Sequence, residues 1–143
     1  MPNSNSQDAP SEDVTHLNIR DSSTLGTDGP VFVLDFLTER ITVRELIRSR
    51  VYQEVKDYNT RQPHYFRGLV QPTDAEQTLN GYKLRKPRQI DWEKQFEQAI
   101  AAFQSNGFII LVDDEQVTEL GEEITVAPET EVTFLKLVPL VGG

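Results

Sequence analysis

The sequence of 143 residues contains no cysteine, so it can form neither a disulfide, nor a thiolate nucleophile, nor a cysteine-based metal site. If the protein takes part in thiol chemistry, the thiol must therefore belong to a partner. Imidazole is almost as scarce, because His16 and His64 are the two histidines and lie far apart in the chain. We expect neither to be catalytic, and we expect no bound metal or cofactor.

Positive charge is also in short supply. The chain has 14 Lys and Arg residues against 23 Asp and Glu residues, which gives a formal net charge of -9 and a pI near 4.7. Binding to the phosphate backbone of nucleic acid needs an electropositive face. We therefore expect no nucleic-acid partner, whereas a basic protein partner steered by charge is compatible with this composition.

Long hydrophobic runs are absent, since the longest apolar stretches have the length of strands, and we expect no membrane-spanning segment. Residues 1–13 are polar and acidic, without the basic and apolar regions of a signal peptide. This composition predicts a disordered N-terminal tail and a cytoplasmic location.

Residues 14–37 are predicted to form a hairpin. Apolar and polar residues alternate over residues 14–20, as in a half-buried strand. Residues 21–30 form a cluster of turn-favouring residues. The β-branched and aromatic run at 31–37 then predicts the returning strand.

A first helix is predicted after this hairpin. Thr42 and Glu45 have the spacing of a capping box, in which each side chain bonds a free backbone amide of the other. The predicted apolar face consists of Val43, Leu46, Ile47, Val51, Val55 and Tyr58. The predicted polar face consists of Arg44, Arg48, Arg50, Glu54 and Lys56.

Prolines and glycines interrupt residues 60–90, which excludes a long element there. Within this segment, residues 73–76 (Thr-Asp-Ala-Glu) are typical of the start of a short helix. The segment also contains the one basic cluster of this acidic chain, at Lys83, Arg85, Lys86 and Arg88. This cluster is either an ordinary solvated surface or a docking patch for an acidic partner.

A second helix is predicted at about 91–105, with Asp91 as its N-cap and Asn106-Gly107 as its stop. Its apolar stripe consists of Trp92, Phe96, Ala99, Ile100 and Phe103. Strands are then predicted at 108–112, 115–117, 124–126 and 131–138, with turns at 113–114 and 128–130. We expect the acidic residues of this region to form a solvated surface; they are Asp113, Asp114, Glu115, Glu119, Glu122 and Glu123.

The last strand runs into Pro139-Leu140-Val141-Gly142-Gly143. Proline has no amide hydrogen and stops strand pairing. Glycine has no Cβ, so Gly142 and Gly143 fit a channel that is too narrow for other residues. We expect a flexible tail, 139–143, that ends in a bare carboxylate.

The order of these elements resembles the β-grasp fold of ubiquitin and of the sulfur carriers ThiS and MoaD. The resemblance rests on residues 41–47 (Ile-Thr-Val-Arg-Glu-Leu-Ile), on residues 124–126 and 131–135, and on the closing Pro-x-x-Gly-Gly. The tail is also similar to that of bacterial ubiquitin-like modifiers. The fold class that the resemblance implies is α+β, a helix over a mixed sheet at 14–138, with an inserted helical and loop segment at about 60–105.

The resemblance also implies a function. An E1-like enzyme would use ATP to adenylate the Gly143 carboxylate, a partner thiol would take the acyl group, and a target amine would receive it. The chain itself would be a protein substrate rather than an enzyme, and Pro139, Leu140, Val141 and Gly142 would be the tail that partners bind. E2-like enzymes and a deconjugating protease are further implied partners. Two alternatives remain: a sulfur carrier with a C-terminal thiocarboxylate, and a non-covalent β-grasp adaptor.

Overall fold

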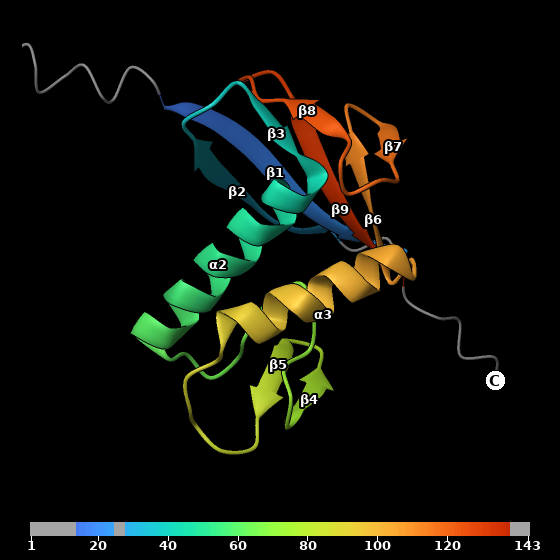
Figure 1. The fold of residues 1–143 in the computed structure, drawn as a ribbon. Helices are drawn as coiled ribbons and strands as arrows, with labels where there is room; N and C mark the ends of the chain where they lie inside the picture. The colour runs from blue at the N-terminus through green and yellow to red at the C-terminus, as the bar shows by residue number, and fades with distance from the viewer. Residues whose placement is uncertain (1–13, 25–27, 138–143) are drawn as a thin grey trace, which may run out of the picture. The chain divides into compact units, whose positions relative to one another are not determined.

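A computed structural model of the chain describes residues 14–24 and 28–137 (Figure 1). The predicted N-terminal tail and the tail 139–143 lie outside the described residues. The described part is α+β, with two helices and a mixed five-stranded sheet, which confirms the predicted class at this level. Neither helix in this part is long and apolar enough to cross a membrane.

The chain divides into two compact units. The sheet unit joins the described residues up to Val43 with those from Gly107 onward, and the helical unit is Arg44–Asn106. The sheet unit is therefore built from two separate stretches of sequence, and the helical unit from the stretch between them.

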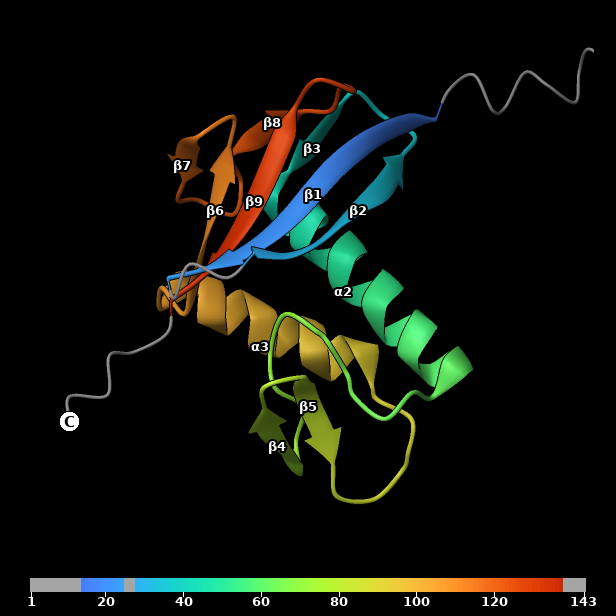
Figure 2. The same cartoon turned by 180° about the vertical axis from the view of Figure 1, so that it is seen from behind.

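The five-stranded sheet has the order β2-β1-β9-β6-β7, in which β9 lies between β1 and β6 (Figure 2). Its strands are β1 Thr15–Ser23, β2 Asp28–Phe36, β6 Phe108–Val112, β7 Glu115–Val117 and β9 Glu131–Lys136. β1 and β9 are parallel, whereas the other three neighbouring pairs are antiparallel. Alternation along the strands buries one row of apolar side chains, namely Leu17, Ile19, Leu34, Phe108, Ile110, Val132 and Phe134.

The β1–β2 hairpin is present as predicted, but its strands are longer than the sequence indicated. Much of the predicted turn at 21–30 is strand, because β1 continues to Ser23 and Ser22 pairs with Asp28. The register shifts between Arg20 and Ser22, as it does at a β-bulge, and the two strands pair on both sides of this shift. Gly29 lets the two strands approach closely at Asp21, since a Cβ on residue 29 would lie 3.0 Å from the Cβ of Asp21.

The remaining strands of the sheet unit form a separate pair. β3 Arg40–Thr42 is antiparallel to β8 Glu123–Thr125, with Ile41 opposite Ile124 and both buried. Between β6 and β7, Asp113 and Asp114 both have positive φ, 50° and 70°. These values suit the two-residue turn that the sequence predicted, because Asp tolerates the left-handed region.

The first helix, α2, spans Val43–Arg61, and all of it except Val43 belongs to the helical unit. It begins directly after Thr42, the predicted cap. Each of the six residues of its predicted apolar face is buried. The prediction for Arg50 was wrong, because its side chain is 1% exposed rather than on the polar face. Arg50 lies four residues after Leu46 and three after Ile47, so it continues the buried stripe.

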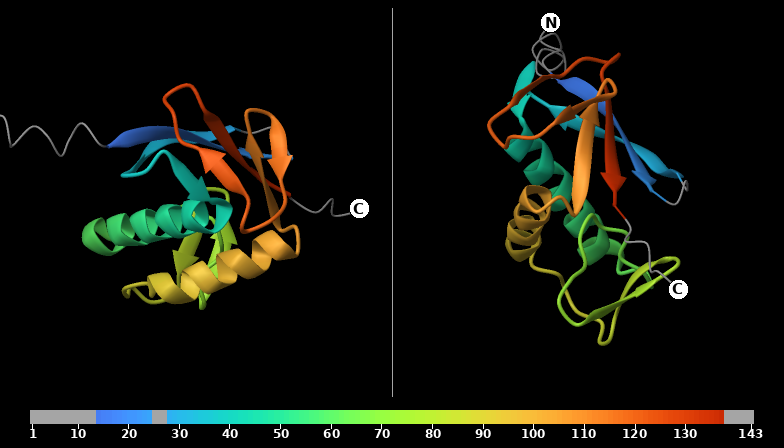
Figure 3. Two further views of the ribbon diagram at one scale, coloured as in Figure 1. Left: turned by 45° about the horizontal axis from the view of Figure 1, so that its top comes forward. Right: turned by 90° about the vertical axis from the view of Figure 1, so that its right-hand side faces the viewer.

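The second helix, α3, spans Trp92–Gln104, and its predicted ends are confirmed. The Asp91 carboxylate accepts hydrogen bonds from the amides of Glu93 (3.0 Å) and Lys94 (3.4 Å). Asn106 has φ 61°, the left-handed conformation of a helix stop. α2 and α3 lie side by side (Figure 3), and the Tyr52 and Trp92 rings meet edge to face at 5.3 Å.

The predicted short helix at 73–76 is wrong, because β4 Ala75–Thr78 and β5 Gly81–Leu84 form an antiparallel hairpin there. Asn80-Gly81, a strong hairpin signal in the sequence, was missed. Gly81 has φ 128°, and a Cβ on it would come within 2.9 Å of the Phe66 carbonyl oxygen. The Thr78 hydroxyl accepts from the Asn80 amide and donates to the Gly81 carbonyl, which closes the turn.

Replacing Leu46 by alanine tests whether the buried face of α2 stabilises the fold. Leu46 is 0% exposed, so we expect Leu46→Ala to lower the free energy of unfolding by about 2–5 kcal/mol. The control is Lys56→Ala on the same helix, since Lys56 is exposed and its loss should cost less than about 0.5 kcal/mol. Urea unfolding curves measure both, and equal effects in the two variants would contradict the assigned burial.

Candidate functional site

The strand that leads to the predicted tail is anchored on both sides. Lys136, the last residue of β9, is paired with Ser23 of β1 and with Phe108 of β6. Its carbonyl accepts from the Thr24 amide at 3.1 Å, and the Leu137 amide donates to the Gly107 carbonyl at 3.4 Å. The fold therefore holds the chain up to Leu137, whereas Pro139, Leu140, Val141, Gly142 and Gly143 lie outside the described residues.

The basic cluster Lys83, Arg85, Lys86 and Arg88 lies on β5 and on the loop that follows it. All four side chains are exposed. Lys83 is opposite Glu76 in the β4–β5 ladder, and among the described residues none of the four makes an ion pair within 4.0 Å. The other three cations follow Leu84, where the ladder ends.

Backbone contacts fix the loop that carries these cations. The Arg85 amide donates to the Asp74 carbonyl at 3.1 Å. The Arg88 guanidinium donates to the carbonyls of Thr73 and Gln89. The cluster is thus presented on an ordered segment, which lowers the entropy cost of binding a partner.

Charge is segregated between the two units. The helical unit, Arg44–Asn106, contains eleven of the 14 basic residues and eight of the 23 acidic residues, a net charge of +3. The rest of the sequence contains three basic and fifteen acidic residues, a net charge of −12, and the two values sum to -9. The overall acidity of the chain conceals a basic segment.

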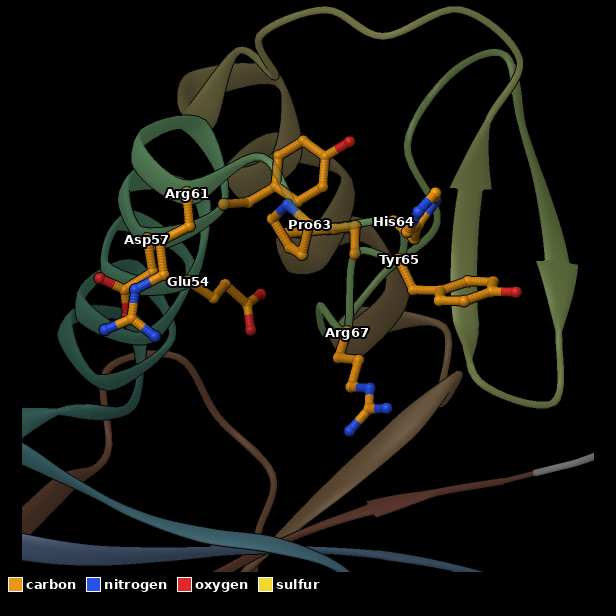
Figure 4. Close-up of a pocket in the computed structure, with 9 residues that line it drawn as sticks. Glu54, Asp57, Arg61, Pro63, His64, Tyr65 and Arg67 are labelled. Carbon is orange, nitrogen blue, oxygen red and sulfur yellow. The ribbon is translucent and has the colours of Figure 1, made fainter.

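A pocket of about 370 Å³ lies in the helical unit, between the C-terminal half of α2 and the segment that follows it (Figure 4). Glu54, Asp57, Tyr58 and Arg61 line it from α2, and Pro63, His64, Tyr65, Phe66 and Arg67 line it from the following segment. Reciprocal backbone hydrogen bonds between Phe66 and Tyr82 (2.8 and 2.9 Å) attach this segment to β5. The sequence did not indicate this pocket.

The polar centre of the pocket wall is Glu54, whose side chain is 16% exposed. It accepts from Arg50 Nε at 3.3 Å and from the Leu69 amide at 2.9 Å. Burial raises the pKa of Tyr82 above 10.0, and the Glu54 carboxylate contributes to the same shift. Because Glu54 already bonds a guanidinium and a backbone amide, we assign it a structural role.

Two further side chains anchor the irregular segment after α2, and neither was predicted. Asn59 donates to the Ile90 carbonyl (2.9 Å) and accepts from the Ile90 amide (2.8 Å). Gln95, 3% exposed, donates to the Val70 carbonyl at 3.1 Å. A long loop with buried backbone needs such partners, because an unpaired buried carbonyl is costly.

The acidic residues of 113–123 are exposed, as predicted. Two of them bond backbone amides: Asp113 accepts from Glu131, and Glu122 from Thr118 and Glu119. No group of three His, Cys, Asp or Glu residues in the described part of the chain is placed to hold a metal. His16 Nδ1 lies 2.5 Å from Asp35 Oδ1 on the exposed sheet surface, and His64 lines the pocket.

No protein-family model matches the chain, and comparison with curated proteins and with solved structures gives no match either.

The raised pKa of Tyr82 predicts a pH-dependent stability. A folded-state pKa above the unfolded value of 10.0 stabilises the fold below that pH, and this stabilisation is lost as the pH rises through the folded pKa. We expect Tyr82→Phe to make the free energy of unfolding fall less steeply above about pH 10 than in the wild type. Urea unfolding at a series of pH values checks this, with Tyr52→Phe, at a residue 43% exposed, as the control. Identical slopes in the Tyr82→Phe variant and the wild type would refute the expectation.

Proposed function

We propose that this chain is a ubiquitin-like protein modifier whose Gly143 carboxylate is the reacting group. The observation that carries the proposal is the run Pro139-Leu140-Val141-Gly142-Gly143, which begins three residues after the end of a central strand that is paired on both sides. Such a strand gives a thin tail a firm point of attachment. The tail can then enter a partner's narrow channel without unfolding the domain.

The strand order supports the proposal. A five-stranded mixed sheet with the order β2-β1-β9-β6-β7 and a parallel central pair is the arrangement expected of a β-grasp sheet. The β1–β2 hairpin leading through β3 into α2 is also the expected succession. We therefore propose a β-grasp fold, in which α2 packs over the five-stranded sheet.

The chemistry proposed for the tail proceeds in three steps. A carboxylate oxygen of Gly143 attacks the α-phosphate of ATP, forms an acyl-adenylate and releases pyrophosphate. A thiolate of the E1-like partner attacks the acyl carbon, forms a thioester and releases AMP. A target amine then attacks the thioester, forms an amide and releases the thiol.

The residue composition matches this division of labour. The chain has no cysteine, so the thiol of the second step must belong to a partner. The proposed partners are an E1-like adenylating enzyme, an E2-like enzyme and a deconjugating protease, and the proposed location is the cytoplasm. ATP is bound by the partner enzyme rather than by this chain.

A sulfur carrier is the second candidate, and the Pro-x-x-Gly-Gly form of the tail favours it. The helical unit favours the modifier, since a basic segment of this size offers recognition surface that sulfur transfer does not need. Intact mass spectrometry after incubation with ATP and an E1-like partner separates the candidates. A modifier forms a thioester or conjugates, a sulfur carrier gains the mass difference between sulfur and oxygen, and a non-covalent adaptor keeps its mass.

Deleting Gly142 and Gly143 tests the role of the tail. We expect the deletion to abolish ATP–pyrophosphate exchange by the E1-like partner, because the carboxylate no longer reaches the nucleotide. The urea unfolding curve should be unchanged, since glycine contributes no side chain to the core. A second variant keeps both glycines and adds one alanine after Gly143, so that the carboxyl group of Gly143 becomes a peptide bond and can no longer react. Exchange by either variant at the wild-type rate would disprove the proposed reaction.

Reversing charge in the basic cluster tests whether it docks the partner. We expect Lys83/Lys86→Glu to slow association with the E1-like enzyme by about tenfold or more, because charges at an interface act mainly on the on-rate. The effect should shrink at 1 M salt, where the screening length is about 3 Å. The control is Lys56/Lys94→Glu, an equal charge change at exposed lysines of α2 and α3. If both double variants slow association equally, net charge is responsible and the cluster is ordinary surface.

A further inference from the structure

β2 lies at the edge of the five-stranded sheet and, among the described residues, pairs with β1 alone. It is nine residues long, as long as any strand of the sheet. The outer edge of such a strand presents backbone donors and acceptors that can pair with another chain.

The side chains of β2 also favour pairing of this edge with another chain. Val31 is 60% exposed and Val33 is 52% exposed, and as alternate residues they project from the same face. Leu34, between Val33 and Asp35, is 4% exposed and belongs to the buried face. Natural proteins usually protect an edge with lysines, a short strand or a proline. β2 has Pro30 near its start but no Lys or Arg.

We propose that β2 pairs with β2 of a second copy of this chain, antiparallel and across a two-fold axis. In a symmetric antiparallel pair, residue numbers that face each other have a constant sum. Full overlap of 28–36 with itself sets that sum to 64 and places Phe32 on the axis. The same register puts Val31 opposite Val33 of the second copy, so the four exposed valines of the two copies meet on one face.

No like charges face each other in this register. Asp35 falls opposite Gly29 of the second copy, and Asp28 falls opposite Phe36 of the second copy. Shifting the sum to 66, the next register that keeps the faces matched, would place Val31 opposite Asp35 and leave one valine pair, Val33 with Val33 of the second copy, in place of two. Full overlap and apolar matching thus select the same register, which argues for a second copy over an unrelated extended segment.

Two features weaken the pair and make it measurable. Pro30 has no amide hydrogen, so the position opposite Leu34 of the second copy lacks one donor. Each copy also carries a net charge of -9, so the two repel at low salt. We therefore expect a weak dimer that salt strengthens, a dependence opposite in sign to that of a dimer held by ion pairs.

Sedimentation equilibrium of the full chain over a range of concentrations, at about 0.1 M and about 1 M salt, tests the pairing. We expect dimer at the higher concentrations and more of it at high salt. Val33→Lys should raise the dissociation constant by about tenfold or more, because it places two ammonium groups at the centre of the contact. Leu79→Lys is the matched control, since Leu79 is fully exposed on the β4–β5 turn and its replacement should leave the dimer unchanged.

Cysteine cross-linking tests the register, and the absence of native cysteine makes it free of background. Residues opposite each other in an antiparallel pair lie close enough for a disulfide. A mixture of Val31→Cys with a tagged Val33→Cys should form a cross-linked heterodimer under mild oxidation, well above the homodimers of either variant alone. Thermal unfolding midpoints equal to that of the wild type verify that the variants are folded.

A chain that stays monomeric at all concentrations and salts would overturn the proposal. Binding of an added extended peptide at β2 by such a monomer would not rescue it, since the partner would then not be a second copy. A dimer that Val33→Lys leaves intact would equally overturn it, since the contact would then lie elsewhere. A dimer lost in Val33→Lys, kept in Leu79→Lys and cross-linked in the mixture supports it.

Discussion

The parallel pairing of β1 with β9 is the contact on which the rest of the sheet unit depends. Six residue pairs, from Asn18–Glu131 to Ser23–Lys136, join the first strand to the last. This pairing closes a loop of more than a hundred residues, and β6 and β7 can add to the sheet only once β9 is in place. The entropy cost of such a closure rises only slowly with length, so a long segment can be accommodated inside the loop.

That loop contains the whole helical unit, whose net charge differs in sign from that of the rest of the chain. A net charge of +3 lies within a chain whose remainder carries −12. The helical unit has contacts of its own, such as the Asn59–Ile90 and Gln95–Val70 hydrogen bonds. In the proposed function, the sheet unit presents the reactive tail and the helical unit offers a surface for recognition.

The pair Arg50–Glu54 shows how a buried charge is tolerated in the helical unit. Removing one partner from such a pair usually costs several kcal/mol, since the other charge is left uncompensated. Here the carboxylate also accepts the Leu69 amide, so the pair fixes the path of the chain after α2 as well as neutralising Arg50. Its location next to the pocket is therefore explained by folding, without a ligand.

Much of the architecture could be predicted from the sequence because it depends on short-range chemistry. The alternation in β1, the apolar stripe of α2, the Asp91 cap and the turn at Asp113-Asp114 are each written within a few neighbouring residues. The composition also decided that any thiol must come from a partner. The closing Pro-x-x-Gly-Gly, on which the proposed function depends, is likewise a property of the sequence.

Other features were decided only by the tertiary structure. The burial of Arg50 depends on Glu54 and the Leu69 amide, and local pattern placed it on the polar side. The attachment of the Ala75–Leu84 hairpin to Phe66, which pairs with Tyr82 from well outside it, was also decided there, although Asn80-Gly81 marked the turn itself in the sequence. The edge position of β2 likewise follows from which strands pair with β1. Such pairings join residues far apart in the chain, so no local pattern of side chains could reveal them.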